Sequence, residues 1–154
     1  MPLLRASLEN MPNGVEFYCR AERQSLASKF QRNKIGKKPD IMALMKYKEK
    51  INELIYVESS RIICDDTKKT EDEVKLWRET LDGMDYVNVA CRPVRNQFGI
   101  IGIQIAGEDI YLNVLVNDAG GLSRYFHLCH AEIPLTPQTP WRIEPLVHLL
   151  LTLR

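Results

Sequence analysis

The sequence predicts an α/β protein, at the border with the α+β class, in which helices flank a central mixed sheet. Two observations support this prediction: β-rich apolar segments occur in neighbouring pairs, and segments with helical spacing separate them. The expected element order is α-β-β-α-β-β-β-α. Because 154 residues correspond to about one domain, we expect a single domain over 15–154 after an irregular lead-in at 1–14.

The first helix is expected over 15–32, where Leu26, Ala27 and Phe30 would share one face. The strands are recognised by β-branched and aromatic residues that lie between polar or glycine-containing turns. The first two strands should form a hairpin. The expected strands are 41–47, 51–63, 98–106, 110–116 and 125–133.

The helix after the hairpin is expected to begin at Thr70, because Thr70 and Glu73 form a T-x-x-E capping box. Apolar side chains that recur at helical spacing should attach this helix to the core. These side chains are Val74, Trp77, Leu81 and Met84.

The last helix, 146–153, is strongly apolar and follows Pro145, a residue that is favoured in a first helical turn. The sequence stops at Arg154 without a helix stop signal, so we expect a domain that is truncated at its C-terminus. An exposed leucine patch on this helix would contact a protein partner or a second copy of the chain. The patch would consist of Leu146, Leu149, Leu150 and Leu153.

The overall charge excludes two classes of protein. Lys plus Arg number 21 and Asp plus Glu number 20, so the net charge of +1 fits neither a histone-like protein nor an acidic disordered tail. No apolar run approaches the ~20 residues that cross a bilayer, and the first residues do not form a signal peptide. We therefore expect no membrane association and an intracellular protein, cytoplasmic or nuclear, with reduced cysteines.

An acidic residue within an apolar strand is the first sign of chemistry. Glu58 follows the run 55–57, and a buried carboxylate is costly unless another group neutralises it. Asp40, at the start of the first strand of the hairpin, would supply a second carboxylate if the hairpin aligns the two. Such hard oxygen ligands suit Mg²⁺, with phosphate and water completing its coordination. Alternatively, Asp40 belongs to a turn and Glu58 pairs at the surface with Arg61 or Lys48.

These residues resemble the PD-(D/E)XK nuclease superfamily, which has the restriction-endonuclease-like fold. The resemblance rests on the segments 39–40 and 58–60 in a strand, hairpin and helix context, and it spans about residues 22–104. It implies that Asp40 and Glu58 hold Mg²⁺, with Glu22 on the preceding helix as a further acidic ligand. The segments 36–40, 56–61 and 72–77 also resemble uncharacterised, lineage-expanded fungal proteins that have no established activity.

The chain departs from the superfamily at the third catalytic position, where Ser60 stands in place of Lys. In this superfamily the Lys can come from elsewhere, such as the following helix, and Lys75 is the expected candidate, with Lys69 behind it. The expected catalytic residues are therefore Asp40, Glu58, Ser60 and Lys75. Otherwise the site is degenerate and holds no cofactor.

Positive charge gathers before Pro39. A run without any acidic residue contains Lys29, Arg32, Lys34, Lys37 and Lys38. Lys34, Lys37 and Lys38 are the expected contacts to a nucleic-acid backbone, with affinity that depends on salt and not on sequence. Alternatively, the run is a solvated helix end, where the helix dipole favours cations.

A second group, His127, Cys129 and His130, suggests zinc ligands. Strand alternation would place His127 and Cys129 on one face and His130 on the other, and no second ligand pair has a suitable spacing. A structural role is therefore favoured for these three residues.

The hypothesis from sequence is a Mg²⁺-dependent phosphodiester hydrolase that acts on nucleic acid, with Ser60 leaving its catalytic activity open. Two alternatives remain. One is a non-catalytic interaction domain on the same scaffold, which binds a protein through the last helix. The other is a DNA- or RNA-binding protein without chemistry, whose affinity would depend on the charges of 29–38.

Overall fold

The computed structural model describes residues 6–8, 16–21, 23–32, 35–47, 50–60, 65–91, 98–118 and 120–153 of the chain. Helices flank a mixed sheet, which confirms the predicted α/β class. The elements in chain order are β1 (Glu16–Ala21), α2 (Leu26–Arg32), β2 (Ile41–Tyr47), β3 (Lys50–Ser59), α3 (Asp66–Cys91), β4 (Gly99–Ala106), β5 (Asp109–Asn117), β6 (Ser123–Glu132), the 3-10 turn η2 (Pro140–Arg142) and α4 (Ile143–Thr152).

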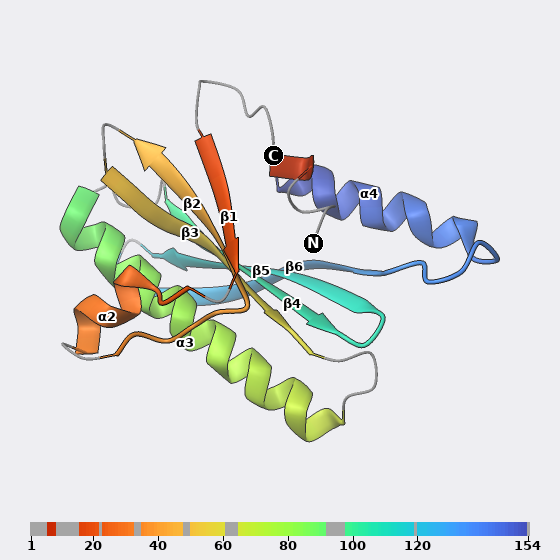
Figure 1. Cartoon of the computed structure of the whole chain (residues 1–154), viewed down its shortest axis with the longest axis horizontal. Coiled ribbons are helices and arrows are strands. Elements are labelled where there is room, and N and C mark those ends of the chain that lie inside the picture. Colours follow the sequence, from red (N-terminus) through yellow and green to blue (C-terminus); the bar gives the residue numbers. More distant parts are fainter. Residues whose placement is uncertain are drawn as a thin grey trace.

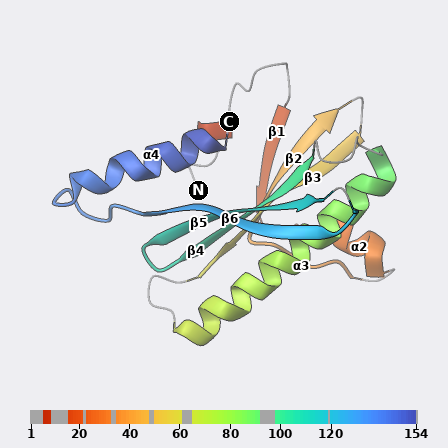
Figure 2. The same cartoon turned by 180° about the vertical axis from the view of Figure 1, so that it is seen from behind.

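The six strands lie in the sheet in chain order, from β1 to β6. Every neighbouring pair is antiparallel except β3 and β4, which are parallel and are connected through α3. A parallel pair needs such a crossover, because the chain must return to the end of the sheet where the first strand began. Figure 1 shows α2 and α3 on one side of the sheet and α4 on the other, and Figure 2 shows the same layers from behind.

Each face of the sheet has its own apolar cluster, and β4 contributes to both by strict alternation. Ile103 and Ile105 lie in the cluster below α4, while Ile100 lies in the cluster below α3. On the α3 side, Gly102 allows the helix to come close, because a Cβ there would lie 3.2 Å from the Leu76 and Thr80 side chains. Successive side chains of β4 point to opposite faces of the sheet, so α3 covers only every second one.

The helix predicted over 15–32 is wrong in its first half. Residues 16–21 form β1, which pairs with β2 from Glu16↔Lys46 to Ala21↔Ile41, and only 26–32 are helical. The aromatic pair Phe17 and Tyr18 favours a strand, but the hydrogen bonds that fix β1 come from a strand more than twenty residues later. Within α2, Ala27 is buried, whereas Leu26 and Phe30 of the expected buried face are exposed.

A bulge in β3 places Glu53 where its carboxylate can accept hydrogen bonds from α2 and the residue before it. Ala43 pairs with Ile55 and Leu44 pairs with Glu53, so Leu54 is the extra residue of β3. The bulge shifts the alternation, and Glu53 and Tyr56 therefore point to the same side, where the Tyr56 hydroxyl donates to Glu53 Oε2 at 3.0 Å. Glu53 also accepts from Ser25 Oγ at 2.5 Å and from the Leu26 amide at 2.6 Å, so a buried carboxylate caps the N-terminus of α2.

The helix α3 begins four residues before the predicted start. Asp65 caps it by accepting from the Lys68 amide at 2.7 Å, and the Thr70 hydroxyl donates back to the Asp66 carbonyl within the helix. The predicted buried face is confirmed for Met84, which is buried, and for Leu81, which packs against the same cluster, but it is wrong for Trp77 and Val74, which are 41% and 39% exposed. The face that α3 buries contains polar residues and a glycine: Asp72, Leu76, Glu79, Thr80, Gly83, Met84 and Val87.

The C-terminal helix α4 packs on the sheet with the leucines that were predicted to form an exposed patch. Leu146, Leu149 and Leu153 are buried in the cluster with β3, β4 and β5 residues, and Leu150 packs against it. That patch is therefore not available to a partner, because it forms part of the core. The exposed apolar residues of α4 are Ile143, Val147 and Leu151.

The other boundaries agree closely with the predictions. β2 has the predicted bounds, and β4, β5, β6 and α4 differ from theirs by one to three residues. β3 ends at Ser59 instead of residue 63. Within the lead-in that was expected to be irregular, residues 6–8 are helical and Leu8 is buried beside α4 in the core.

Candidate functional site

The first two site residues meet across the β2–β3 hairpin. Ile41 pairs with Val57, so Asp40 and Glu58 are the next residues outward on the two strands. Met42 and Tyr56, two positions inward, lie in the cluster below α3, and period-2 alternation puts Asp40 and Glu58 on that same side. Asp40 Oδ2 accepts from the Ser59 amide at 2.7 Å, which fixes the Asp40 carboxylate at the end of β3.

Glu58 is only 2% exposed, and a lysine from α3 neutralises it. Lys75 Nζ lies 2.6 Å from Glu58 Oε2, although the two residues are 17 positions apart in the chain. Burial raises the pKa of Glu58, the Lys75 ammonium lowers it, and the charge of Asp40 raises it again. Burial opposes the charge of Lys75, but its hydrogen bond to Glu58 and that negative charge raise the Lys75 pKa. The structure therefore brings Asp40, Glu58 and Lys75 together.

A fourth charged residue of this cluster, Glu79, did not emerge from the sequence. It lies one helical turn after Lys75 and is 0% exposed. Burial first, and then the charge of Glu58, raise the pKa of Glu79 to about 9. Among the described residues no donor reaches either Glu79 oxygen or Glu58 Oε1. A proton held by Glu79 would therefore be shared with Glu58. Its sequence signal is the spacing from Lys75 and Leu76, which places Glu79 on the buried face of α3.

Ser60, the residue in place of the motif Lys, lies at the margin of the cluster. Its hydroxyl donates to Asp72 Oδ2, and the other Asp72 oxygen lies 2.5 Å from Lys68 Nζ. Burial opposes the Asp72 charge, but the bonds from Lys68 and Ser60 lower its pKa. Ser60 thus attaches the first turns of α3 to the end of β3, and it does not contact Glu58 in the structure described.

The other site residues predicted from the sequence lie in different places. Lys37 lies 3.6 Å from Asp82 on α3, and Lys38 is exposed. Lys34 and Glu22, a predicted phosphate contact and a predicted metal ligand, lie outside the described residues. The second lysine suggested from sequence, Lys69, donates to the Tyr111 hydroxyl at 2.8 Å and not to Glu58.

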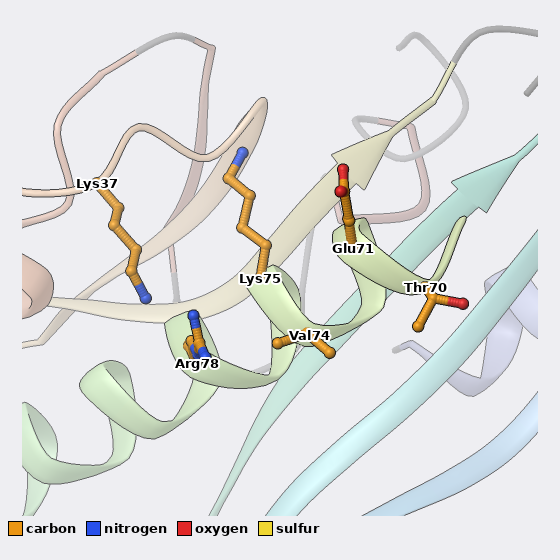
Figure 3. Close-up of a pocket in the computed structure, with 6 residues that line it drawn as sticks. All are labelled: Lys37, Thr70, Glu71, Val74, Lys75 and Arg78. Atoms are coloured by element: carbon orange, nitrogen blue, oxygen red, sulfur yellow. The ribbon is translucent and has the colours of Figure 1, made fainter. Parts of the chain in front are cut away.

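An open cavity of about 390 Å³ lies beside the cluster. Figure 3 shows that its basic side chains come from two elements: Lys37 from the segment before β2, and Lys75 and Arg78 from α3. In the same view Lys75 extends from α3 toward the strands, whereas Thr70 points away from Lys75. The cavity therefore combines positive charge at its wall with a lysine that reaches the buried carboxylate.

Two carboxylates of the site are the candidate ligands for Mg²⁺. Asp40 and Glu58 supply the hard carboxylate oxygens that Mg²⁺ prefers, and the buried Glu58 Oε1 lacks a donor among the described residues. Within the described ranges, no group of three His, Cys, Asp or Glu side chains is placed to hold one metal ion. Mg²⁺ is commonly held by one or two carboxylates with water and phosphate, so the pair Asp40 and Glu58 fits that ion.

The second candidate group is arranged differently from its prediction. Leu112 pairs with Cys129 and Asn113 pairs with His127, so Leu128 is a bulge residue in β6. The bulge places His127 and His130 on the same side, where their ring centroids are 5.9 Å apart. Cys129 packs on the α4 side. The predicted alternation was wrong because it assumed an unbroken strand.

Comparison with known proteins adds no relative: no family model, no curated protein and no solved structure matches the chain. Among the described helices, none is long and apolar enough to cross a membrane. The site must therefore be interpreted from its own geometry.

Proposed function

We propose that the chain is a metal-dependent phosphodiester hydrolase that acts on nucleic acid, with a site like that of the PD-(D/E)XK superfamily. The observation that carries the proposal is the 2.6 Å contact between Lys75 Nζ and Glu58 Oε2 beside Asp40. These are the two acids and the lysine that such a site requires, and here the lysine comes from α3 because position 60 is Ser.

Each residue has a task that its surroundings support. Asp40 and Glu58 would hold Mg²⁺, and the ion would supply Lewis-acid polarisation of a phosphate oxygen and a water of lowered pKa. Lys75 would orient the attacking water or stabilise the negative charge that develops on the phosphate. Lys37 and Arg78, on the wall of the 390 Å³ cavity, would bind the phosphate backbone.

A second function has a specific observation in its favour. The ion pair with Lys75 already neutralises Glu58. This feature is also expected of a degenerate site, in which the domain binds nucleic acid or a protein without cutting. The two functions differ in whether Glu58 is needed for turnover or only for folding.

Cleavage of supercoiled plasmid and of single-stranded DNA and RNA, with Mg²⁺ or Mn²⁺ and with EDTA, separates the two functions. The hydrolase requires metal-dependent cleavage that Glu58→Gln and Asp40→Asn abolish and that Lys75→Met reduces by about 10²-fold or more. Glu73→Gln, which changes an exposed acid on the same helix outside the cavity wall, is the matched control. Absence of cleavage by the wild-type protein, or full cleavage by Glu58→Gln, would reject catalysis at this site.

A further inference from the structure

A row of side chains crosses the sheet from the Glu58 site to the outer strand. Glu58 of β3 pairs with Gln104 of β4, Gln104 pairs with Tyr111 of β5, and Tyr111 pairs with His130 of β6. Directly paired residues point to the same face, so all four lie on the α3 side. Because neighbouring strands are about 4.8 Å apart, His130 lies roughly 14 Å from Glu58 along this row.

The outer end of the row is an aromatic cluster. The Tyr111 and His130 rings are stacked, with centroids 5.9 Å apart and planes at 25°. His127 joins them at 6.0 Å from Tyr111, because the bulge at Leu128 turns both histidines to this face. Both histidines are exposed and Tyr111 is half-buried. The two histidine side chains therefore remain accessible at the end of the row opposite to Glu58.

A fixed cation lies at the same place. Lys69 Nζ donates to the Tyr111 hydroxyl at 2.8 Å and lies 4.5 Å from the centre of its ring. The hydrogen bond to Tyr111, and then the charges of Asp109 and Asp66, raise the pKa of Lys69. The backbone of Lys69 is held as well, because Gln104 Nε2 donates to its carbonyl at 2.7 Å.

Two acids at the outer edge are paired with an arginine. Arg142 lies 2.9 Å from Glu108 and 2.5 Å from Glu132, the residue two positions after His130. Two carboxylates that would repel a phosphate are thereby neutralised at the edge of the cluster. The surface then offers two imidazoles, a phenol ring and an ammonium group, with the carboxylates of Asp109 and Asp66 near Lys69.

We propose that Tyr111, His127, His130 and Lys69 form a binding site for single-stranded nucleic acid, in which the rings stack on bases and Lys69 contacts a phosphate. The substrate class, nucleic acid, rests on the proposed function. Stacking on side chains requires bases that are not enclosed in a duplex. The interval of roughly 14 Å to Glu58 corresponds to a few nucleotides of a single strand. The site would thus bind the strand to one side of the scissile phosphate.

The test is fluorescence anisotropy in EDTA with a labelled oligonucleotide of about 12 nucleotides, as single-stranded DNA, single-stranded RNA and duplex DNA. Tyr111→Leu and His130→Ala are expected to weaken single-strand binding by roughly 5- to 100-fold and duplex binding much less. Tyr111→Phe retains the ring and should retain most of the affinity. Phe126→Leu, which changes an exposed aromatic residue of β6, the strand that carries His130, is the matched control. Thermal melts of each variant report on folding.

The outcomes separate this inference from the proposed function. Binding that depends on Tyr111 without any cleavage supports the inference and removes the hydrolase. Cleavage that depends on Glu58, together with unchanged single-strand binding in Tyr111→Leu and His130→Ala, overturns the inference and keeps the hydrolase. Equal weakening by Phe126→Leu, or preference of the wild-type protein for the duplex, also overturns it. The DNA and RNA probes show which of the two strands the site prefers.

Discussion

A Cβ atom at Gly83 of α3 would lie 2.6 Å from the Tyr56 hydroxyl oxygen and 2.7 Å from its ring carbon Cε2. Helix and strand are therefore in closer contact here than a larger residue allows. Tyr56 is fully buried, and its hydroxyl donates to Glu53, the carboxylate that caps α2. Burial, and then the charge of Glu53, raise the Tyr56 pKa well above its ordinary value, so the phenol remains a donor.

Gly83→Ala is expected to destabilise the protein although alanine is the better helix former. The gain in helix propensity is about 1 kcal/mol, whereas overpacking in a rigid core costs about 1–3 kcal/mol. We expect a net loss in the free energy of unfolding, measured by urea denaturation. Val89→Ala, at an exposed position of α3, is the control and should change stability little. A Gly83→Ala protein as stable as the wild type would contradict the close contact.

Glu53→Gln is expected to loosen α2. The amide keeps the size of the side chain but loses the charge that accepts from Ser25, the Leu26 amide and Tyr56. Hydrogen bonds to a charged group contribute roughly 1.5–3 kcal/mol each, so we expect a loss of that order in the free energy of unfolding. Hydrogen exchange should accelerate in 26–32 more than in β4 and β5. The idea fails if exchange in α2 is unchanged.

Glu79 should make the free energy of unfolding depend on pH. Its pKa is raised from 4.5 to about 9, so the native state binds one more proton than the unfolded state between these pH values. The free energy of unfolding then falls as pH rises, by about 1.4 kcal/mol per pH unit while a full proton differs. Glu79→Gln should flatten this slope. Urea denaturation at about pH 5, 7 and 9 in EDTA measures it, and Glu71→Gln should retain the wild-type slope.

The ion pair between Glu58 and Lys75 should show coupling in a double-mutant cycle. Lys75→Met leaves a buried carboxylate without its cation, and Glu58→Gln removes the charge that attracts the ammonium. We expect the double variant to be more stable than the sum of the single losses predicts, by about 0.5–3 kcal/mol. Equilibrium denaturation of all four proteins measures this coupling. Strict additivity would mean that the 2.6 Å contact does not persist in solution.

Sequence reasoning placed the strands well where local pattern decides them. The hairpin of β2 and β3 follows from two apolar segments around a polar turn, and its register explains why Asp40 and Glu58 are neighbours. The resemblance predicted a lysine from the following helix, and the structure places Lys75 of that helix against Glu58. The catalytic roles of these residues remain predictions.

The errors have physical causes that a single sequence does not display. The bulges at Leu54 and Leu128 each reverse the side-chain alternation, and no turn residue marks either one. On α3, Asp72, Glu79 and Gly83 interrupt the apolar residues of the buried stripe, so its periodic pattern is weak. Trp77 is apolar and recurs at helical spacing, so the sequence predicted that it would be buried, but its side chain is exposed. The Asp72 carboxylate is buried here because Lys68 and Ser60 compensate its charge, and the bond from Ser60 exists only in the tertiary arrangement.

The strand order has a consequence for how the chain reaches its native state. The hairpin β2–β3 and the meander β4–β5–β6 form across short connections, so their contacts are local and their loop-closure entropy is small, whereas β1 reaches β2 only across the segment that contains α2. The parallel pairing of β3 with β4 spans the whole of α3 and is the one non-local step between the hairpin and the meander. Lys75 reaches Asp40 and Glu58 only when α3 packs on the paired strands β3 and β4. The site is therefore expected to assemble last, after both halves of the sheet have formed.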